Sequence, residues 1–540
     1  MLTKGKKILV GTLCVLATIG AAGAVAGIIY QQKALNIIDD TIRSDKWLGV
    51  EFGADGEATR LGAAEGKLAG INGERNDFDL LPVYRKIHTY AENGEKKWMV
   101  NDFYYKHVVT GTVGSEGFKE AFYVCEKQLD DTWTLPAAFV DAKGENRGHF
   151  TLGAYKASYN DDKTKLLSKK GSYGAVALTL EEGRKLAKAN SAVVAEQRKT
   201  DIVNTLMMIE FAQRDVQDTF QGMIGSQMTA SWDATLNAAT GKVNYLNISS
   251  NQSIPDLIKA WTPGLGVFVT DGAGETYDGG FRTITGVSVE NLATSSSAAS
   301  SSSAPASTTR VAKISFDGEG IDFSALNATI AEKTGVNNNT VELDTGYAIN
   351  GICDSLAGSS HELKSINGHD LAVGNRPFAW RGLENVYGST FEMIDGSVMK
   401  TVSSATPANK KATLDVCMDP ALYGEAKDGM TSAIDYKTAF TLGTFVSNAL
   451  DIAAFQSDAE GFEGMLVPGQ TVADSTFEAY YGDVAGLRDN SAATSETTVY
   501  SGLYRGTAAG SNRSIGPSFV DGNDFANANC SIGARLSFDI

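Results

Sequence analysis

The chain has 540 residues, of which 43% are hydrophobic, so it is long enough to bury a large core in one or several domains. Lys and Arg total 47 against 64 Asp and Glu, which gives a net charge of −17. Outside the first seven residues no run is rich in Lys or Arg, and an acidic chain without a basic stripe is not expected to bind nucleic acid. The five histidines are widely spaced, so the sequence predicts neither a metal site nor a cofactor.

The first 30 residues predict a membrane anchor. Three lysines lie within residues 1–7, and residues 8–30 form an uncharged apolar run that is long enough, as a helix, to cross a bilayer. The flanking charge predicts a single-pass protein of the cell membrane with an extracellular C-terminal domain. Residues 24–26 (Ala-Val-Ala) are also typical of a signal cleavage site, so a cleaved secretory signal is the alternative, and a buried structural helix is a third. An apolar stripe over residues 31–46 predicts a stalk helix that continues from the anchor.

Four further elements stand out in chain order. Aromatic and β-branched residues predict strands over residues 97–109 and 118–127. Thr179 and Glu182 form a capping-box pattern, which predicts that a helix begins at this point. The apolar spacing over residues 200–221 predicts a second, more buried helix.

We expect residues 47–540 to form one domain that carries a β-rich insertion at about 226–350, where Gly-dense turns are frequent. Within the insertion, residues 293–309 are rich in Ser and Ala. Such a segment cannot bury enough apolar area to offset its ordering entropy, so it is predicted to be a flexible surface segment. Two more glycine-rich, strand-like regions follow at 364–401 and 464–540.

Three groups of short motifs, taken together and in this order, resemble one family. The groups are W-M-V (98–100), F-Y-Y-K (103–106), P-A-A-F (136–139), G-A-Y (153–155), S-K-K-G (168–171) and I-E-F-A-Q-R-D-V-Q (209–217), then W-R-G-L-E-N-V-Y-G (380–388) and F-E-M-I-D-G (391–396), then Y-R-G (504–506) and S-I-G-A-R-L-S-F (531–538). They resemble the C-type lectin fold of the formylglycine-generating-enzyme-like type. The similarity is greatest to ligand-binding proteins of phage tails and bacterial surfaces, including variable proteins diversified by retroelements. This resemblance implies an α+β fold of short twisted strands with two helices, which the membrane helix would precede.

In the diversified relatives, the variable side chains lie between the R-G and I-G-A-R motifs, so the resemblance implies a binding face at residues 507–531, here called the 507–531 window. Its Ser, Asn, Asp and Phe residues match those that adenine-targeted codon changes generate, and Ser and Asn make adaptable contacts. An ordinary polar surface loop is the alternative. The residues expected to contact a ligand are Thr507, Ser511, Asn512, Ser514, Phe519, Asp521, Asn523, Asn527 and Asn529.

The sequence does not predict an enzyme. The enzymes of the fold that this chain resembles place two cysteines just after the R-G motif. Here residues 507–514 contain no cysteine, and Cys530 has no neighbouring cysteine with which to form a redox pair. Glu384, Asn385 and Asp395 are predicted to order turns through hydrogen bonds from backbone to side chain, with cation ligation as the alternative.

These observations predict a membrane-anchored, surface-displayed binding protein, similar to an adhesin or a receptor. Its C-terminal loops would bind a protein or a glycan on another cell or particle. The alternative is a virion structural protein, such as a tail-fibre or receptor-binding subunit, in which the apolar helix packs within an assembly instead of a bilayer.

Overall fold

The structure is a computed structural model of the whole chain. It describes residues 43–223, 229–237, 241–248, 261–270, 276–293, 308–334, 341–403, 410–423, 436–445, 449–457, 459–472, 484–486, 497–506, 520–523 and 531–538. Strands dominate these residues, so the predicted α+β class is wrong and the fold is mostly β. Helical periodicity is confined to short segments, whereas the Gly-dense, β-branched regions form long strands. The three α-helices among the described residues are α3 (Leu180–Lys188), α4 (Gln197–Phe211) and α6 (Phe323–Thr334).

The expectation of a single-pass membrane protein also needs correction. None of the helices in the described part of the chain is both long enough and apolar enough to cross a membrane. The longest of them, α4, has 15 residues, which at 1.5 Å per residue spans about 22 Å, less than the roughly 30 Å of a bilayer core. Residues 8–30, on which the prediction was based, lie outside the described residues, as do residues 31–42 of the predicted stalk.

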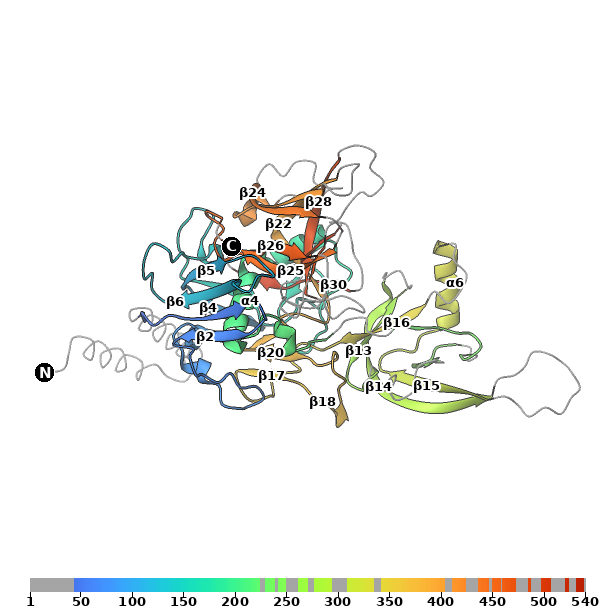
Figure 1. The fold of residues 1–540 in the computed structure, drawn as a ribbon. Helices are drawn as coiled ribbons and strands as arrows, with labels where there is room; N and C mark the ends of the chain where they lie inside the picture. Colours follow the sequence, from blue (N-terminus) through green and yellow to red (C-terminus); the bar gives the residue numbers. More distant parts are fainter. Residues whose placement is uncertain are drawn as a thin grey trace, which may run out of the picture.

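Two antiparallel sheets form the N-terminal part of the core (Figure 1). The first has the order β2-β1-β6-β5, and the second has the order β10-β31-β7-β4-β3. The strand predicted over 97–109 is divided, because Asp102 and Phe103 interrupt it between β4 and β5. The bounds are β1 (Leu48–Gly53), β2 (Ala58–Gly62), β3 (Ile87–Glu92), β4 (Glu95–Asn101), β5 (Tyr104–Thr110), β6 (Lys119–Cys125), β7 (His149–Gly153), β10 (Val193–Val194) and β31 (Leu536–Ser537).

The helices α3 and α4 test the two helix predictions. Helix α3 begins after Thr179, whose side chain accepts a hydrogen bond from the Glu182 backbone while the Glu182 side chain accepts one from the Thr179 backbone, so the capping box is confirmed. All 15 residues of α4 are buried, and the helix contacts β1, β6 and β22 (Phe391–Ser403). The prediction over 200–221 is too long at its end, because Ala212 adopts a left-handed conformation (φ 51°) that terminates α4.

A large C-terminal sheet packs beside this core, shown in orange and red in Figure 1. Its strands follow the order β24-β23-β22-β28-β29-β27-β25-β26, and the short strand β30 pairs with the far end of β22. The bounds of these strands are β23 (Lys410–Val416), β24 (Lys437–Phe445), β25 (Ala449–Gln456), β26 (Val467–Val472), β27 (Val484–Gly486), β28 (Thr497–Arg505), β29 (Val520–Asn523) and β30 (Ile532–Gly533).

The region predicted as an insertion contains a separate sheet, which extends to one side of the core in Figure 1. Its order is β11-β16-β13-β14-β15-β12, and it has its own cluster of buried side chains, including Trp261 and Ile314. The Ser/Ala-rich residues 294–307 lie outside the described residues. The bounds are β11 (Thr229–Ser231), β12 (Tyr245–Ile248), β13 (Gly266–Thr270), β14 (Thr276–Ala293), β15 (Thr308–Phe316) and β16 (Glu342–Tyr347).

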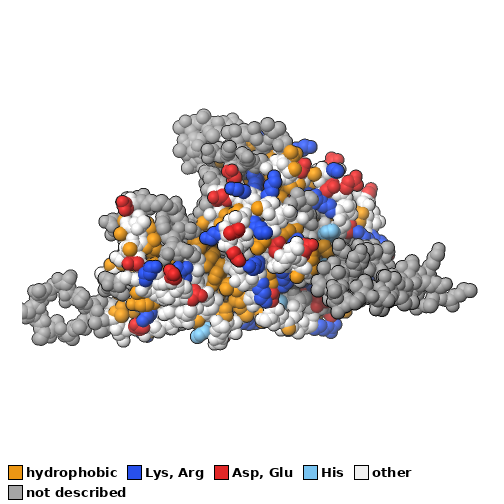
Figure 2. Space-filling model, turned by 180° about the vertical axis from the view of Figure 1, so that it is seen from behind, with side chains coloured by type: hydrophobic (Ala, Val, Ile, Leu, Met, Phe, Trp, Pro, Cys, Tyr) orange, Lys and Arg blue, Asp and Glu red, His pale blue; other side chains and the backbone are white. Residues whose placement is uncertain are grey.

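The surface carries both signs of charge. On the face shown in Figure 2, acidic and basic side chains are interspersed among polar and apolar ones. Exposed large apolar side chains among the described residues include Leu68, Leu80 and Val373.

Candidate functional site

The structure describes only two of the nine residues expected to contact a ligand. Asp521 and Asn523 lie in β29, which is antiparallel to β28 with Tyr504 opposite Asp521 and Gly502 opposite Asn523. These two positions are therefore placed beside the strand that carries the R-G motif. The others lie outside the described residues: Thr507, Ser511, Asn512, Ser514, Phe519, Asn527 and Asn529.

The two strands that flank the 507–531 window pair with the same residue of the C-terminal sheet, Glu392. Arg505, at the end of β28, pairs with Glu392 on one side of β22, and Gly533 of β30 pairs with Glu392 on the other side. Neighbouring strands lie about 4.8 Å apart, so the two ends are about 10 Å from each other. The chain therefore leaves β22 on one side of Glu392 before the window and returns to the other side of Glu392 after it.

The first end of the window is held by a buried ion pair. The side chain of Arg505 is buried, and its Nη1 atom lies 3.6 Å from Oδ1 of Asp201 in α4. The other carboxylate oxygen of Asp201 accepts a hydrogen bond from the Leu466 backbone at 2.9 Å. Burial raises the pKa of Asp201 to about 7. Gly506 follows with φ +86°, a left-handed conformation that favours glycine, and its carbonyl accepts a hydrogen bond from the Gly388 backbone.

The second end of the window is held by Arg535, whose side chain is only 1% exposed. Its Nε atom donates to Oε1 of Glu392 at 2.9 Å. Its Nη1 atom donates to the Gly153 carbonyl at 2.9 Å, and its Nη2 atom donates to the carbonyls of Glu384 and Asn385 at 2.8 Å each. One guanidinium thus joins β7, β22 and the end of β21 (Leu383–Glu384) to the last strands.

Lys156 completes the charge cluster at this end. Its Nζ atom lies 2.7 Å from Oε1 of Glu392, and both side chains are buried. Burial lowers the pKa of Lys156 to about 8, although the carboxylate of Glu392 opposes this shift. For Glu392, burial acts to raise the pKa, but the charges of Arg535 and Lys156 hold it below its usual value. Glu392 is therefore ionised at neutral pH and anchors two cations under the window.

The ion pairs of Arg505 with Asp201 and of Arg535 and Lys156 with Glu392 are together called the base of the window. The W-R-G-L-E-N motif forms a tight hairpin beside this base. Strands β20 (Phe378–Trp380) and β21 are joined by Arg381 and Gly382, both with positive φ (49° and 85°), as in a two-residue type I′ turn. The carboxylate of Glu384 accepts backbone hydrogen bonds from Gly351 (2.9 Å) and Cys353 (3.0 Å), and Asn385 accepts one from Phe378 (3.2 Å).

These hydrogen bonds confirm the predicted turn-ordering role of Glu384 and Asn385. Asp395 acts similarly, because it accepts a hydrogen bond from the Gly396 backbone at 2.8 Å and forms a bidentate ion pair with Arg184. Burial raises the pKa of Glu384 to about 7.

Three buried acidic residues in the base and beside it were not assigned from the sequence. Asp201 and Glu210 lie in α4, and Glu392 lies in β22. Their signal in the sequence is a charged residue inside an apolar stretch, as in Ile209-Glu210-Phe211, because such residues are rarely buried unless they are paired. The sequence does not reveal the partners, which lie more than a hundred residues away.

The described residues offer little for nucleophilic or metal chemistry. Cys125, Cys353 and Cys417 are free and buried, and burial raises the pKa of the first two thiols. Within the described ranges, no group of three or more His, Cys, Asp and Glu side chains is arranged to hold a metal ion. The arrangement instead forms a rigid, charge-paired support for the 507–531 window.

Comparison of the sequence with protein-family models and with curated proteins finds no match. The family resemblance therefore depends on the quoted motifs alone.

Proposed function

We propose that the protein is a ligand-binding protein that presents the 507–531 window from a rigid base. The observation that carries this proposal is the closure of the window on both sides of Glu392, with Arg505 and Arg535 buried in ion pairs at its two ends. A segment held in this way can change its side chains without changing the strands from which it starts.

The composition of the window indicates the kind of contact. Ser, Asn and Gly residues supply adaptable hydrogen bonds, and Phe519 supplies an apolar anchor. A few such residues can dominate the affinity of an interface. We propose that the ligand is a protein or a glycan on another cell or particle, and that the window varies between natural copies of the gene, as in the retroelement-diversified proteins that the motifs resemble.

Variation is tested by sequencing the 3′ end of the gene from a natural population. We expect substitutions at adenine positions of codons 507–531, and an unchanged sequence for residues 532–535, because Arg535 is part of the buried base. A window as invariant as the base would contradict diversification. A receptor with a fixed ligand, or a virion component such as a tail-fibre subunit, would then be the better hypothesis.

Binding is tested with the full chain on a glycan microarray and on a panel of intact bacterial cells. Where a probe binds, the double variant Asn512→Ala/Asn527→Ala should weaken binding at least tenfold while the melting temperature changes by no more than about 2 °C, because surface substitutions rarely exceed 0.5 kcal/mol. The matched control is Lys143→Ala/Glu145→Ala in an exposed turn outside the window. Equal loss in both double variants, or no loss in the first, would contradict the proposal.

A further inference from the structure

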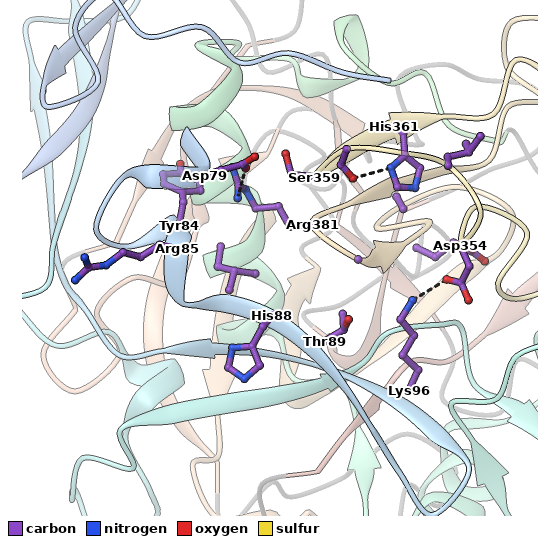
Figure 3. A pocket seen from close by; sticks show the side chains of 16 residues that line it. Asp79, Tyr84, Arg85, His88, Thr89, Lys96, Asp354, Ser359, His361 and Arg381 are labelled. Atoms are coloured by element: carbon purple, nitrogen blue, oxygen red, sulfur yellow. Dashed lines mark hydrogen bonds and ion pairs between the residues drawn. The ribbon is translucent and has the colours of Figure 1, made fainter. Parts of the chain in front are cut away.

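A polar cleft among the described residues has the size of a small-molecule site. Its volume is about 430 Å³, within the range of known ligand pockets. It lies between β3, the residues around β17 (Ser360–Glu362) and the turn that joins β20 to β21 (Figure 3). We call it the β3–β20 cleft.

One wall of the cleft is built on Arg381. Its Nε and Nη2 atoms form a bidentate pair with the buried Glu210 at 2.8 Å each, and its Nη1 atom lies 3.1 Å from Oδ1 of Asp79. The guanidinium also lies over the Tyr84 ring, 4.8 Å from its centroid. The side chain of Asp79 is 47% exposed, so its carboxylate is accessible from the cleft.

The opposite wall is built on Lys96 and Asp354. The Nζ atom of Lys96 lies 2.6 Å from Oδ1 of Asp354. The other oxygen of Asp354 accepts a hydrogen bond from the Tyr155 hydroxyl at 2.6 Å and lies 3.1 Å from Lys170 Nζ. Figure 3 shows this pair across the cleft from Arg381 and Asp79. The charged side chains of both walls are therefore already paired, Arg381 with two carboxylates and Asp354 with two lysines.

His361 lies between these walls and is only 6% exposed. Its Nδ1 atom is 3.3 Å from the Gly358 carbonyl. Its Nε2 atom is buried and makes no hydrogen bond of normal geometry in the described part of the chain, although the Cys353 carbonyl faces the ring. Burial lowers the pKa of His361, so the ring is neutral at pH 7.

The walls are held in place before any ligand binds. A Cβ atom on Gly382 would lie 2.5 Å from Cγ2 of Thr89, so the turn can approach β3 closely only because residue 382 is glycine. The backbone of Arg381 also donates to the Ser359 carbonyl at 2.5 Å. A pre-formed cleft loses little conformational entropy on binding.

The charge pattern selects the chemical class of the ligand. The cations of both walls are neutralised by carboxylates, so the cleft does not attract an anion strongly, and an organic cation would have to displace Lys96 or Arg381. Paired side chains of this kind still offer free donor hydrogens and acceptor lone pairs. Hydroxyl groups satisfy both, because each one donates and accepts, and two adjacent hydroxyls can bridge a cation and its carboxylate.

We propose that the β3–β20 cleft binds a neutral polyhydroxylated ligand of one or two saccharide residues, with Asp79 and Arg381 contacting it from one side and Lys96 and Asp354 from the other. None of the window residues that the structure describes, 520–523 and 531, lines this cleft.

The test is saturation-transfer NMR of the full chain with a defined panel of probes. The panel contains glucose, galactose, mannose, N-acetylglucosamine and their β1→4-linked disaccharides, with inorganic phosphate and acetate as anionic probes. We expect saturable binding of at least one saccharide, which phosphate does not compete. Asp79→Ala and Lys96→Met should each weaken binding about tenfold or more, because each removes hydrogen bonds to a charged group.

Lys97→Met is the matched control. Lys97 is the next residue of β4, points to the opposite face of the sheet and lies over the Phe538 ring instead of the cleft. It should bind the saccharide as the unchanged protein does. If Lys96→Met does not fold, Asp79→Ala decides the matter, because its side chain is half exposed. Absence of saccharide binding, binding unchanged in Asp79→Ala, or stronger binding of phosphate would each overturn the proposal.

Discussion

Arg535 joins segments that are far apart in the sequence, because its guanidinium donates hydrogen bonds to Glu392 and to the carbonyls of Gly153, Glu384 and Asn385. Replacing it by Ala would remove this donor from three buried carbonyls and would remove one of the cations that face Glu392. We expect Arg535→Ala to lower the free energy of unfolding by about 3–5 kcal/mol. Lys at this position keeps the charge but cannot reach the same carbonyls, so Arg535→Lys should show an intermediate loss.

Urea unfolding followed by fluorescence measures both losses. Arg75→Ala is the control, because Arg75 is exposed and its ion pair with Asp77 should contribute less than about 1 kcal/mol. A loss below about 1 kcal/mol for Arg535→Ala would show that the base of the window does not depend on this cluster.

A second prediction at the residue scale is that Glu384 makes the free energy of unfolding depend on pH. Burial raises its pKa to about 7, whereas the pKa of a Glu side chain in the unfolded chain is about 4.3. Between these two pH values, Glu384 is protonated in the folded protein and ionised in the unfolded chain. The stability from this proton is fully present below about pH 4 and is lost as the pH rises through 7. Glu384→Gln cannot titrate, so its free energy of unfolding should fall less steeply from pH 5 to 7, by up to about 1.4 kcal/mol per pH unit.

The comparison needs urea titrations of both proteins at several pH values. Glu145→Gln, at an exposed position, should keep the slope of the unchanged protein. Parallel curves for Glu384→Gln and the unchanged protein would mean that Glu384 is ionised in the fold at pH 5.

At the scale of elements, α3 shows what a local signal can predict. Its capping box involves two residues three positions apart, and the structure contains both reciprocal hydrogen bonds. Thr179→Ala should therefore lower the free energy of unfolding by about 1 kcal/mol, measured by urea titration. Thr179→Ser keeps the hydroxyl and should retain most of that stability. If Ser is as destabilising as Ala, the methyl group of Thr179 matters more than its hydrogen bond.

Elements whose ends depend on distant residues were not predicted correctly. The strand expected over 97–109 is interrupted at Asp102, which is buried because it accepts hydrogen bonds from Arg43 and Asn146. Helix α4 is buried on all sides, so an apolar stripe could not define its bounds. Its charged residues are paired, Lys199 with the N-cap residue Glu196 and Glu210 with the distant Arg381. Local patterns thus located these elements, and tertiary contacts determined where they end.

At the scale of the whole molecule, the sequence indicated the window but not its support. The polar composition of residues 507–531 and the flanking motifs are visible locally. The pairing of both ends of the window with Glu392 cannot be seen in the local sequence, because Arg535 and Glu392 are separated by 143 residues. The mostly β fold was missed because the resemblance emphasised the two helices of the core, whereas the region predicted as an insertion and the C-terminal region contribute long strands.

The role of the last strands can be tested by truncation. A chain that ends at Asn523 lacks β30, Arg535 and β31, which pairs with both β7 and β10. We expect this chain to lose its cooperative thermal transition in calorimetry, whereas a full-length chain with Asn512→Ala and Asn527→Ala should retain it. A cooperative transition of the truncated chain within a few degrees of the full-length protein would show that the C-terminal strands are dispensable.

The position of Arg535 after the 507–531 window has a consequence for the reading frame of the gene. An insertion or deletion of one nucleotide within codons 507–531 changes every later codon and so removes both Arg535 and β31, which pairs with β7 and β10 of the N-terminal sheet. Such a chain should fail to fold and be degraded, whereas we expect a chain with substitutions in the window to fold. If the window varies as proposed, the requirement for Arg535 and β31 would remove the chains whose reading frame has shifted and retain those that carry only substitutions.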